Sequence, residues 1–240
     1  MAGTLLLLKD AGCTIHTINL ANGCAGSTEL PPGQIAAVRW KEAQASARLL
    51  GSVHHECLVE DLEVFYTQDL VRRVTGLVRQ VKPDLVLTQS MEDYMEDHMN
   101  TARLAVTGTF SRNIPNYRTI PDAPAIFEDC MLYHATPHIL TDMMRRPITP
   151  EIFVDVGAVL DRKEKLLACH ASQKEWLDRT QGVGSFLRES RDLAEKVGTM
   201  SGRFRFAEGW RRHSHIGFSR QDTNPLADIL KDLCHTTTAR

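Results

Sequence analysis

The most constraining feature of the sequence is its alternation of amphipathic segments with short apolar runs. Six apolar residues recur at helical spacing between positions 67 and 81 and predict a helix with one buried face: Leu70, Val71, Val74, Leu77, Val78 and Val81. Pro83 and Asp84 mark a turn, and the apolar run Leu85–Thr88 is typical of a buried strand. This alternation favours an α/β protein with a mainly parallel sheet in a three-layer αβα, Rossmann-like arrangement.

The same pattern extends along most of the chain. Further helices are expected at residues 3–9, 34–50, 98–110, 158–177 and 185–197, with Gly12 and Gly51 as stops. Further strands are expected at residues 14–20, 57–59, 125–135 and 151–157. We expect a single domain over residues 1–221 and a loosely held polar tail over residues 222–240.

The beginning of this pattern is unusual, because the chain opens in a helix that leads into a strand. In a parallel layout such a helix crosses over from an earlier strand, and in doubly wound folds that first strand is often central. The pattern therefore predicts a sheet whose first strand is missing from the chain.

Composition excludes several classes of protein. The chain is 42% hydrophobic, with a net charge of −2 and a pI of about 6.5, so neither nucleic acid nor an anionic membrane is an expected partner. The run Leu5–Leu8 is too short for a signal peptide or a membrane span. Six scattered cysteines without a C-x-x-C pair are typical of reduced thiols, and the cytoplasm is the expected location.

The segment "SMEDYMEDHMNT", residues 90–101, follows the expected strand Leu85–Thr88 and concentrates four carboxylates, Tyr94 and His98. Ligands of open α/β sheets bind at the carboxyl ends of the strands. Asp97 is either an N-cap or a site residue, and a single imidazole does not make a metal site. For Glu92, Asp93 and Glu96 we expect a solvated acidic surface rather than a hard-cation site.

Arg39 and Glu42 lie three residues apart on the helix expected at residues 34–50. They form either an ordinary intrahelical ion pair or a guanidinium held by Glu42 for a sugar or a carboxylate. The sequence has no G-x-S-x-G, Walker A, G-x-G-x-x-G or H-E-x-x-H motif, which disfavours serine hydrolases, P-loop proteins and dinucleotide-binding enzymes.

Taken in order, five segments resemble the PIG-L/LmbE-like family of zinc-dependent N-deacetylases. They cover most of the chain: "MAGTLLLLKDAGCTIHTINLANGCAG", "RWKEAQASARLLG", "KPDLVLTQSMEDYMEDHMNT", "KEKLLACHASQ" and "FAEGWRR". The family acts on N-acetylglucosaminyl and related N-acyl groups. The resemblance thus implies zinc as cofactor and a small amino sugar as substrate, and a homo-oligomer is one of the oligomeric states left open.

Residue roles follow from the same resemblance. "MEDH" stands at the family's His-Pro-Asp-His loop, so His98 is implied as a zinc ligand and Asp97 as the loop aspartate. Met95 replaces the histidine thought to steady the oxyanion, and methionine cannot donate a hydrogen bond. Tyr94 is an adjacent donor that would substitute for it, and Arg39 matches the arginine that contacts substrate.

One departure concerns the family's Ala-His-Pro-Asp-Asp motif, which supplies two zinc ligands and the general base. The segment matched by "MAGT" lies just after it, so we expect either an upstream start or a truncated homologue, and favour the first. We expect this chain by itself to bind zinc weakly and to lack deacetylase activity. The alternatives are a non-catalytic carbohydrate-binding or regulatory homologue and, less favoured, a Rossmann-like nucleotide binder.

Overall fold

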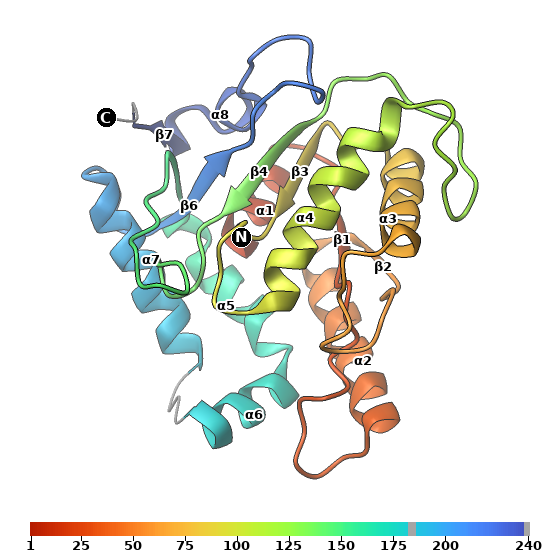
Figure 1. Ribbon diagram of the computed structural model, residues 1–240. Coiled ribbons are helices and arrows are strands. Elements are labelled where there is room, and N and C mark those ends of the chain that lie inside the picture. The colour runs from red at the N-terminus through yellow and green to blue at the C-terminus, as the bar shows by residue number, and fades with distance from the viewer. Residues whose placement is uncertain (182–185, 238–240) are drawn as a thin grey trace. The chain divides into compact units, whose positions relative to one another are not determined.

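The computed structural model describes residues 1–181 and 186–237 (Figure 1). The helices of the described residues are α1 (Ala2–Asp10), α2 (Pro32–Leu50), α3 (Gln68–Val81), α4 (Glu96–Phe110), η1 (Ser111–Asn113), η2 (Gly157–Val159), α5 (Leu160–Ala168), α6 (Ala171–Gln181), α7 (Phe186–Ser201), α8 (Pro225–Leu230) and η3 (Lys231–Leu233). The strands are β1 (His16–Ile18), β2 (Val53–His55), β3 (Leu85–Thr88), β4 (Met131–Ala135), β5 (Ile152–Asp155), β6 (Ala207–Arg212) and β7 (Cys234–Thr236).

The fold is α/β with parallel strands, which confirms the expected class. β1 pairs in parallel with β2, and β3 pairs in parallel with β4. A second sheet has the strand order β3-β4-β6-β5-β7, in which β4 and β6 are antiparallel. The parallel pairs place the carboxyl ends of neighbouring strands at one edge, where ligands bind in such sheets.

The chain forms two compact units, each assembled from separate stretches. The first contains Met1–Glu63, Phe153–Glu208 and Asp232–His235. The second contains Val64–Ile152, Gly209–Lys231 and, of the described residues after His235, Thr236 and Thr237. The loop after β3 therefore belongs to the second unit and the helix α2 to the first.

Several elements form where local sequence predicts them. α3 begins after Thr67, whose hydroxyl accepts a hydrogen bond from the Leu70 N–H, and it ends at Lys82 in the left-handed conformation. Its buried face carries Leu70, Val71, Val74 and Val78 and packs against α4 (Figure 1). Gly51 follows α2 with φ 72°, so the expected glycine stop is confirmed. Gly12, with φ 93°, follows the Ala11 cap of α1 in the same way.

Three expectations differ from the structure. The strand expected at residues 57–59 is instead β2, Val53–His55, and Val59 makes only an isolated bridge to Ala21. The helix expected at residues 158–177 is broken after Ala168 into α5 and α6. In place of a loose tail, residues after 222 form α8 and β7, because Leu226 is fully buried and Asn224 caps α8.

The described residues include no helix long and apolar enough to cross a membrane. All six cysteines are free thiols, as their spacing predicts. Burial raises the pKa of Cys130 to about 12 and that of Cys234 to about 11, so both thiols stay protonated near neutral pH.

Candidate functional site

The acidic loop, residues 89–95, connects the end of β3 to the start of α4. Thr88, the last residue of β3, is in register with His134 on β4. Because the two strands are parallel, the loop and His134 lie at the same carboxyl edge of the sheet. This edge carries the residues singled out in the sequence, Tyr94 in the loop and Asp97 and His98 in the first turn of α4.

Asp93 is the residue of this loop that sequence reasoning placed wrongly. It is only 3% exposed, so it does not belong to a solvated acidic surface. Its Oδ1 lies 3.1 Å from Nδ1 of His98 and accepts the backbone N–H of Met95 at 3.2 Å. A carboxylate is an acceptor, so Nδ1 of His98 carries the proton and Nε2 presents its lone pair. This is the arrangement in which carboxylates orient metal-binding histidines.

Asp97 is not the N-cap of α4. Met95 occupies the cap position without a side-chain cap bond, and Asp97 lies in the first helical turn, where a negative charge is favourable. Asp97 is buried, at 8% exposure. Asp97 is therefore a buried residue of the first turn of α4 and not part of the preceding loop.

Tyr94 is half-exposed and packs edge-on against the His98 imidazole, with 5.7 Å between ring centroids. Burial and the neighbouring Asp93 raise the pKa of its phenol. The hydroxyl is thus a neutral donor near neutral pH. Its contact with His98 supports its place in the candidate site.

A zinc ion requires more donors than this edge supplies. Catalytic zinc takes about three protein ligands and an open position. Residues 1–181 and 186–237 hold no group of three His, Cys, Asp or Glu side chains arranged to bind a metal. His98 Nε2 has the right chemistry, but the described residues do not make a complete zinc site.

A pair of histidines lies beside the acidic loop and was not predicted from the sequence. Nδ1 of His134 lies 2.8 Å from the Gln89 carbonyl oxygen, and Nε2 of His134 lies 3.1 Å from Nδ1 of His213. Burial is the main cause that lowers the pKa of both imidazoles, so both are neutral near pH 7. The two residues are 79 positions apart, so no short-range spacing pattern in the sequence predicts their contact.

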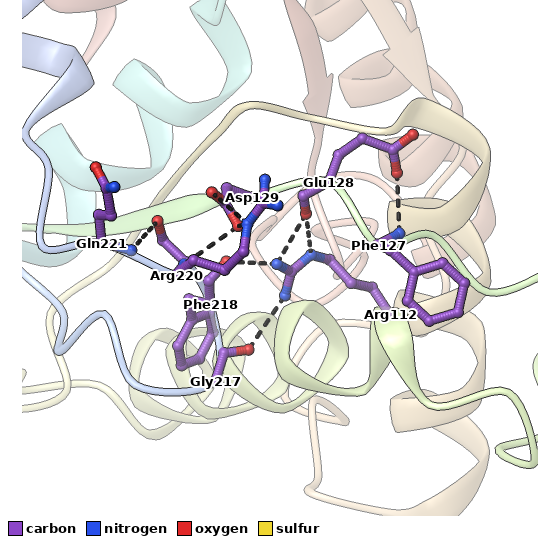
Figure 2. Close-up of polar contacts among 9 residues, drawn as sticks. Arg112, Phe127, Glu128, Asp129, Gly217, Phe218, Arg220 and Gln221 are labelled. Carbon is purple, nitrogen blue, oxygen red and sulfur yellow. Dashed lines mark hydrogen bonds and ion pairs between the residues drawn. The ribbon is translucent and has the colours of Figure 1, made fainter.

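Arg112 holds the segment that follows His213. Its guanidinium is buried and donates to the Thr109 carbonyl oxygen at 2.9 Å. It also donates to the carbonyl oxygens of Glu128 at 3.0 Å and Gly217 at 3.3 Å, and to that of Phe218 (Figure 2). The Phe218 ring then packs edge-on against His213, at 5.0 Å between centroids. The imidazole of His213 is therefore held from two sides.

The candidate substrate residue Arg39 lies in the first unit, on α2. Its Nη2 donates to the Gly26 carbonyl oxygen at 2.8 Å, and its Nε is buried without a hydrogen-bond partner among the described residues. A Cβ atom at Gly26 would lie 2.4 Å from Nη2, and one at Gly23 would lie 2.6 Å from Nη1. The glycine loop therefore fits closely around this guanidinium.

Glu42 does not form the expected ion pair with Arg39. Its two oxygens accept the backbone N–H of Ser172 at 2.9 Å and the Ser172 hydroxyl at 2.7 Å. Ser172 lies in the first turn of α6, where unpaired N–H groups and the helix dipole favour an anion. Glu42 thus caps α6 from another helix.

Two histidines lie near this corner of the first unit. Burial is the main cause that lowers the pKa of His170 and of His54, and Arg39 lowers that of His170 further. Nε2 of His54 is buried without a partner among the described residues, while its Nδ1 lies 2.9 Å from the Thr17 hydroxyl. His170 directly precedes α6, the helix that Glu42 caps.

Glu208, in the segment "FAEGWRR", anchors the start of α1. It accepts the backbone N–H groups of Gly3 at 3.0 Å and Thr4 at 2.8 Å, and it pairs with Lys163 at 3.0 Å. Burial by itself would raise the pKa of this carboxyl, but the neighbouring positive charge and the N–H donors lower it well below its usual range. Glu208 is therefore a structural carboxylate rather than a proton donor.

Residues 1–108 match the family model described as PIG-L, GlcNAc-PI de-N-acetylase. This match confirms the resemblance to the PIG-L/LmbE-like family. The matched PIG-L segment contains Arg39, Tyr94, Asp97 and His98.

Curated relatives of this chain fall into two kinds. A diacetylchitobiose deacetylase of Thermococcus kodakarensis is 26% identical over 88% of this chain and 76% of its own length. A 4-oxalmesaconate hydratase of Pseudomonas putida is 26% identical over 72% of this chain and 67% of its own length. A solved N,N'-diacetylchitobiose deacetylase of Pyrococcus horikoshii superposes with a TM-score of 0.73 at 25% identity, covering 94% of this chain and 82% of that one. A deacetylase-type function is therefore supported.

Proposed function

We propose that this chain forms part of an N-deacetylase that removes the acetyl group from an N-acetylglucosamine-like amino sugar. The observation that carries the proposal is the His98 imidazole, which Asp93 orients at the carboxyl edge of β3 inside the segment matched to the de-N-acetylase family. Zinc is the implied cofactor, and His98 Nε2 is the atom that would ligate it. We place the protein in the cytoplasm, with no nucleic-acid or membrane partner.

The other residues have assigned roles in this proposal. Arg39 contacts the substrate, the role that the family resemblance implies for it, and its guanidinium is held by the Gly26 carbonyl oxygen and the close-fitting glycine loop. Tyr94 supplies the hydrogen bond that Met95 cannot supply. Asp97 holds negative charge beside His98 at the start of α4.

The chain by itself is expected to bind well below one equivalent of zinc, because its described residues hold no group of three ligands. Zinc content after purification and dialysis measures this directly. His98→Asn is expected to lower even this residual binding. One equivalent of tightly bound zinc, retained by the chain, would contradict the expectation.

Catalysis is tested by extending the chain at its start with a segment that carries Ala-His-Pro-Asp-Asp, the motif implied by the resemblance. Acetate release from N,N'-diacetylchitobiose is expected from the extended protein with zinc and not from the same protein with His98→Asn. Lys41→Ala, an exposed change on α2, serves as the control that leaves activity unchanged.

A hydratase is the second candidate, because the Pseudomonas putida hydratase matches at the same identity as the Thermococcus enzyme. The two reactions differ in substrate, since one acts on an N-acetyl sugar and the other on a carboxylated acid. Water addition to such an acid by the extended protein, without acetate release, would favour the hydratase. Sugar binding without any turnover would favour a non-catalytic homologue.

A further inference from the structure

The His134–His213 pair has a definite protonation pattern. The Gln89 carbonyl can only accept, so the proton of neutral His134 lies on Nδ1 and its Nε2 must accept. Nδ1 of His213 therefore donates to His134, and Nε2 of neutral His213 carries the lone pair. The Gln89 carbonyl, just after β3, thus fixes the tautomer of His134, and His134 in turn fixes the tautomer of His213.

The lone pair of His213 is open to a ligand. His213 is half-buried, and its Nε2 makes no hydrogen bond within the described part of the chain. Nε2 is also not among the side-chain atoms that are both buried and unpaired, so solvent reaches it. The imidazole is held by His134 on one side and by Phe218 on the other.

The side chain of His213 contacts His134, which lies at the edge that carries the acidic loop. His134 is in register with Thr88 on β3 and with Arg211 on β6. Arg211 reaches the loop residue Glu92, with 3.7 Å between Nη1 and Oε2, so this cation is already paired. A ligand at His213 therefore meets the neutral acceptor Nε2, while the nearby charge of Arg211 is offset by Glu92.

We propose that His213 is a specificity-determining residue, whose Nε2 accepts a hydrogen bond from a substrate hydroxyl, and that His134 is the positioning residue that holds it in this state. A carboxylate only accepts hydrogen bonds, so it finds no donor at this atom. The site therefore takes a hydroxyl-bearing amino sugar in preference to a polycarboxylate. This inference rests on the proposed N-deacetylase function and narrows its substrate class.

The first test measures the tautomers without any substrate. Two-bond ¹⁵N–¹H correlation spectra of the ¹⁵N-labelled chain at pH 8 are expected to show His134 and His213 protonated at Nδ1, the less common form of free histidine. His213→Asn and His134→Asn assign the signals. A proton on Nε2 of His213 would overturn the inference, even if the extended protein released acetate.

The second test measures binding of N,N'-diacetylchitobiose and of tricarballylate, a tricarboxylate without a hydroxyl group, to the chain at pH 8. His213→Asn keeps a donor where Nδ1 stood but loses the Nε2 acceptor, so it is expected to weaken sugar binding about tenfold, the effect of one lost hydrogen bond. His215→Asn, two residues along in the same segment, is the matched control. His213→Gln places an amide oxygen near the former Nε2 and is expected to recover part of the affinity.

The outcomes separate the two proposals. Unchanged sugar affinity in His213→Asn, or tighter binding of tricarballylate than of the sugar by the unaltered chain, would overturn the inference. A chain that does not bind the sugar would overturn it as well. If His213→Asn weakens sugar binding but the extended protein never releases acetate, the inference stands and the catalytic proposal fails.

Discussion

The acidic loop and the start of α6 both depend on a buried or half-buried carboxylate, but the two carboxylates find their partners at very different distances along the chain. Asp93 in the acidic loop binds His98, five residues away in the first turn of α4. Glu42, in α2, binds Ser172, 130 residues away, and caps α6, a helix far from α2 in the sequence. The sequence suggested neither partner, since Asp93 was expected on a solvated acidic surface and the ion pair considered for Glu42 was with Arg39.

The difference shows that closeness in sequence is enough for the first contact but not for the second. A loop of a few residues brings Asp93 and His98 together whatever the rest of the chain does. The Glu42–Ser172 contact exists only after α2 and α6 have packed. We therefore expect its loss to affect the whole first unit, whereas loss of Asp93 acts mainly on one imidazole.

The largest expected effect is that of Glu42→Ala. It leaves the first N–H groups of α6 without their anionic acceptor, and hydrogen bonds to charged groups contribute about 1.5–3 kcal/mol each. We expect the free energy of unfolding to fall by about 2 kcal/mol, measured by urea denaturation. Lys41→Ala on the same helix is the control and should change it by less than about 0.5 kcal/mol. Equal losses of unfolding free energy in Glu42→Ala and Lys41→Ala would show that the Glu42–Ser172 contact does not stabilise the first unit.

A smaller effect is expected from Asp93→Asn, about 1 kcal/mol in unfolding free energy, because one hydrogen bond to a charged acceptor is weakened. The specific readout is the His98 tautomer, which should lose its preference for a proton on Nδ1 in ¹⁵N–¹H correlation spectra. Glu92→Gln, in the same loop but exposed, should leave the tautomer unchanged. An unchanged His98 spectrum in Asp93→Asn would show that Asp93 does not orient the ring.

The pH dependence of stability should involve both units. Burial lowers the pKa of His54 and His170 in the first unit and of His134 and His213 in the second. Between these lowered values and about 6.5, the unfolded chain binds more protons than the folded one, so stability rises with pH through this window. The urea midpoint should be higher at pH 8 than at pH 5.5, and His134→Asn should reduce the difference. A midpoint independent of pH would contradict the buried, neutral imidazoles.

The smallest expected effect is that of Tyr94→Phe. The ring keeps its edge-on contact with His98, and only the hydroxyl is lost. Stability should change by less than about 0.5 kcal/mol, as for surface substitutions. Acetate release by the extended protein should nevertheless fall if the hydroxyl replaces the donor missing at Met95. A variant with full activity would remove Tyr94 from the proposed site.

Much of the local structure was predictable because it depends on neighbouring residues. The apolar stripe of α3, the glycine stops at Gly12 and Gly51 and the strand Leu85–Thr88 all follow from short-range propensity and turn chemistry. The same holds for the placement of the acidic loop after β3. Each prediction required only the residues of one element and its ends.

The remaining features required the packed chain. Residues after 222 form α8 because burying Leu226 outweighs the polar composition of the segment, and β2 lies earlier than expected because Val53–His55 pairs with β1. The functional pairs show the same limit, since no spacing rule connects His134 to His213 or Glu42 to Ser172.

The sequence by itself determined the α/β class, the family resemblance and the choice of His98, because these depend on periodicity and on short motifs. Only the tertiary structure decided which atoms of these residues are available. The Asp93 carboxylate leaves Nε2 of His98 with its lone pair, and the Gln89 carbonyl, acting through His134, does the same for His213. The physical reason is that a hydrogen bond assigns protons only when donor and acceptor are within about 3 Å, a distance that sequence alone does not specify.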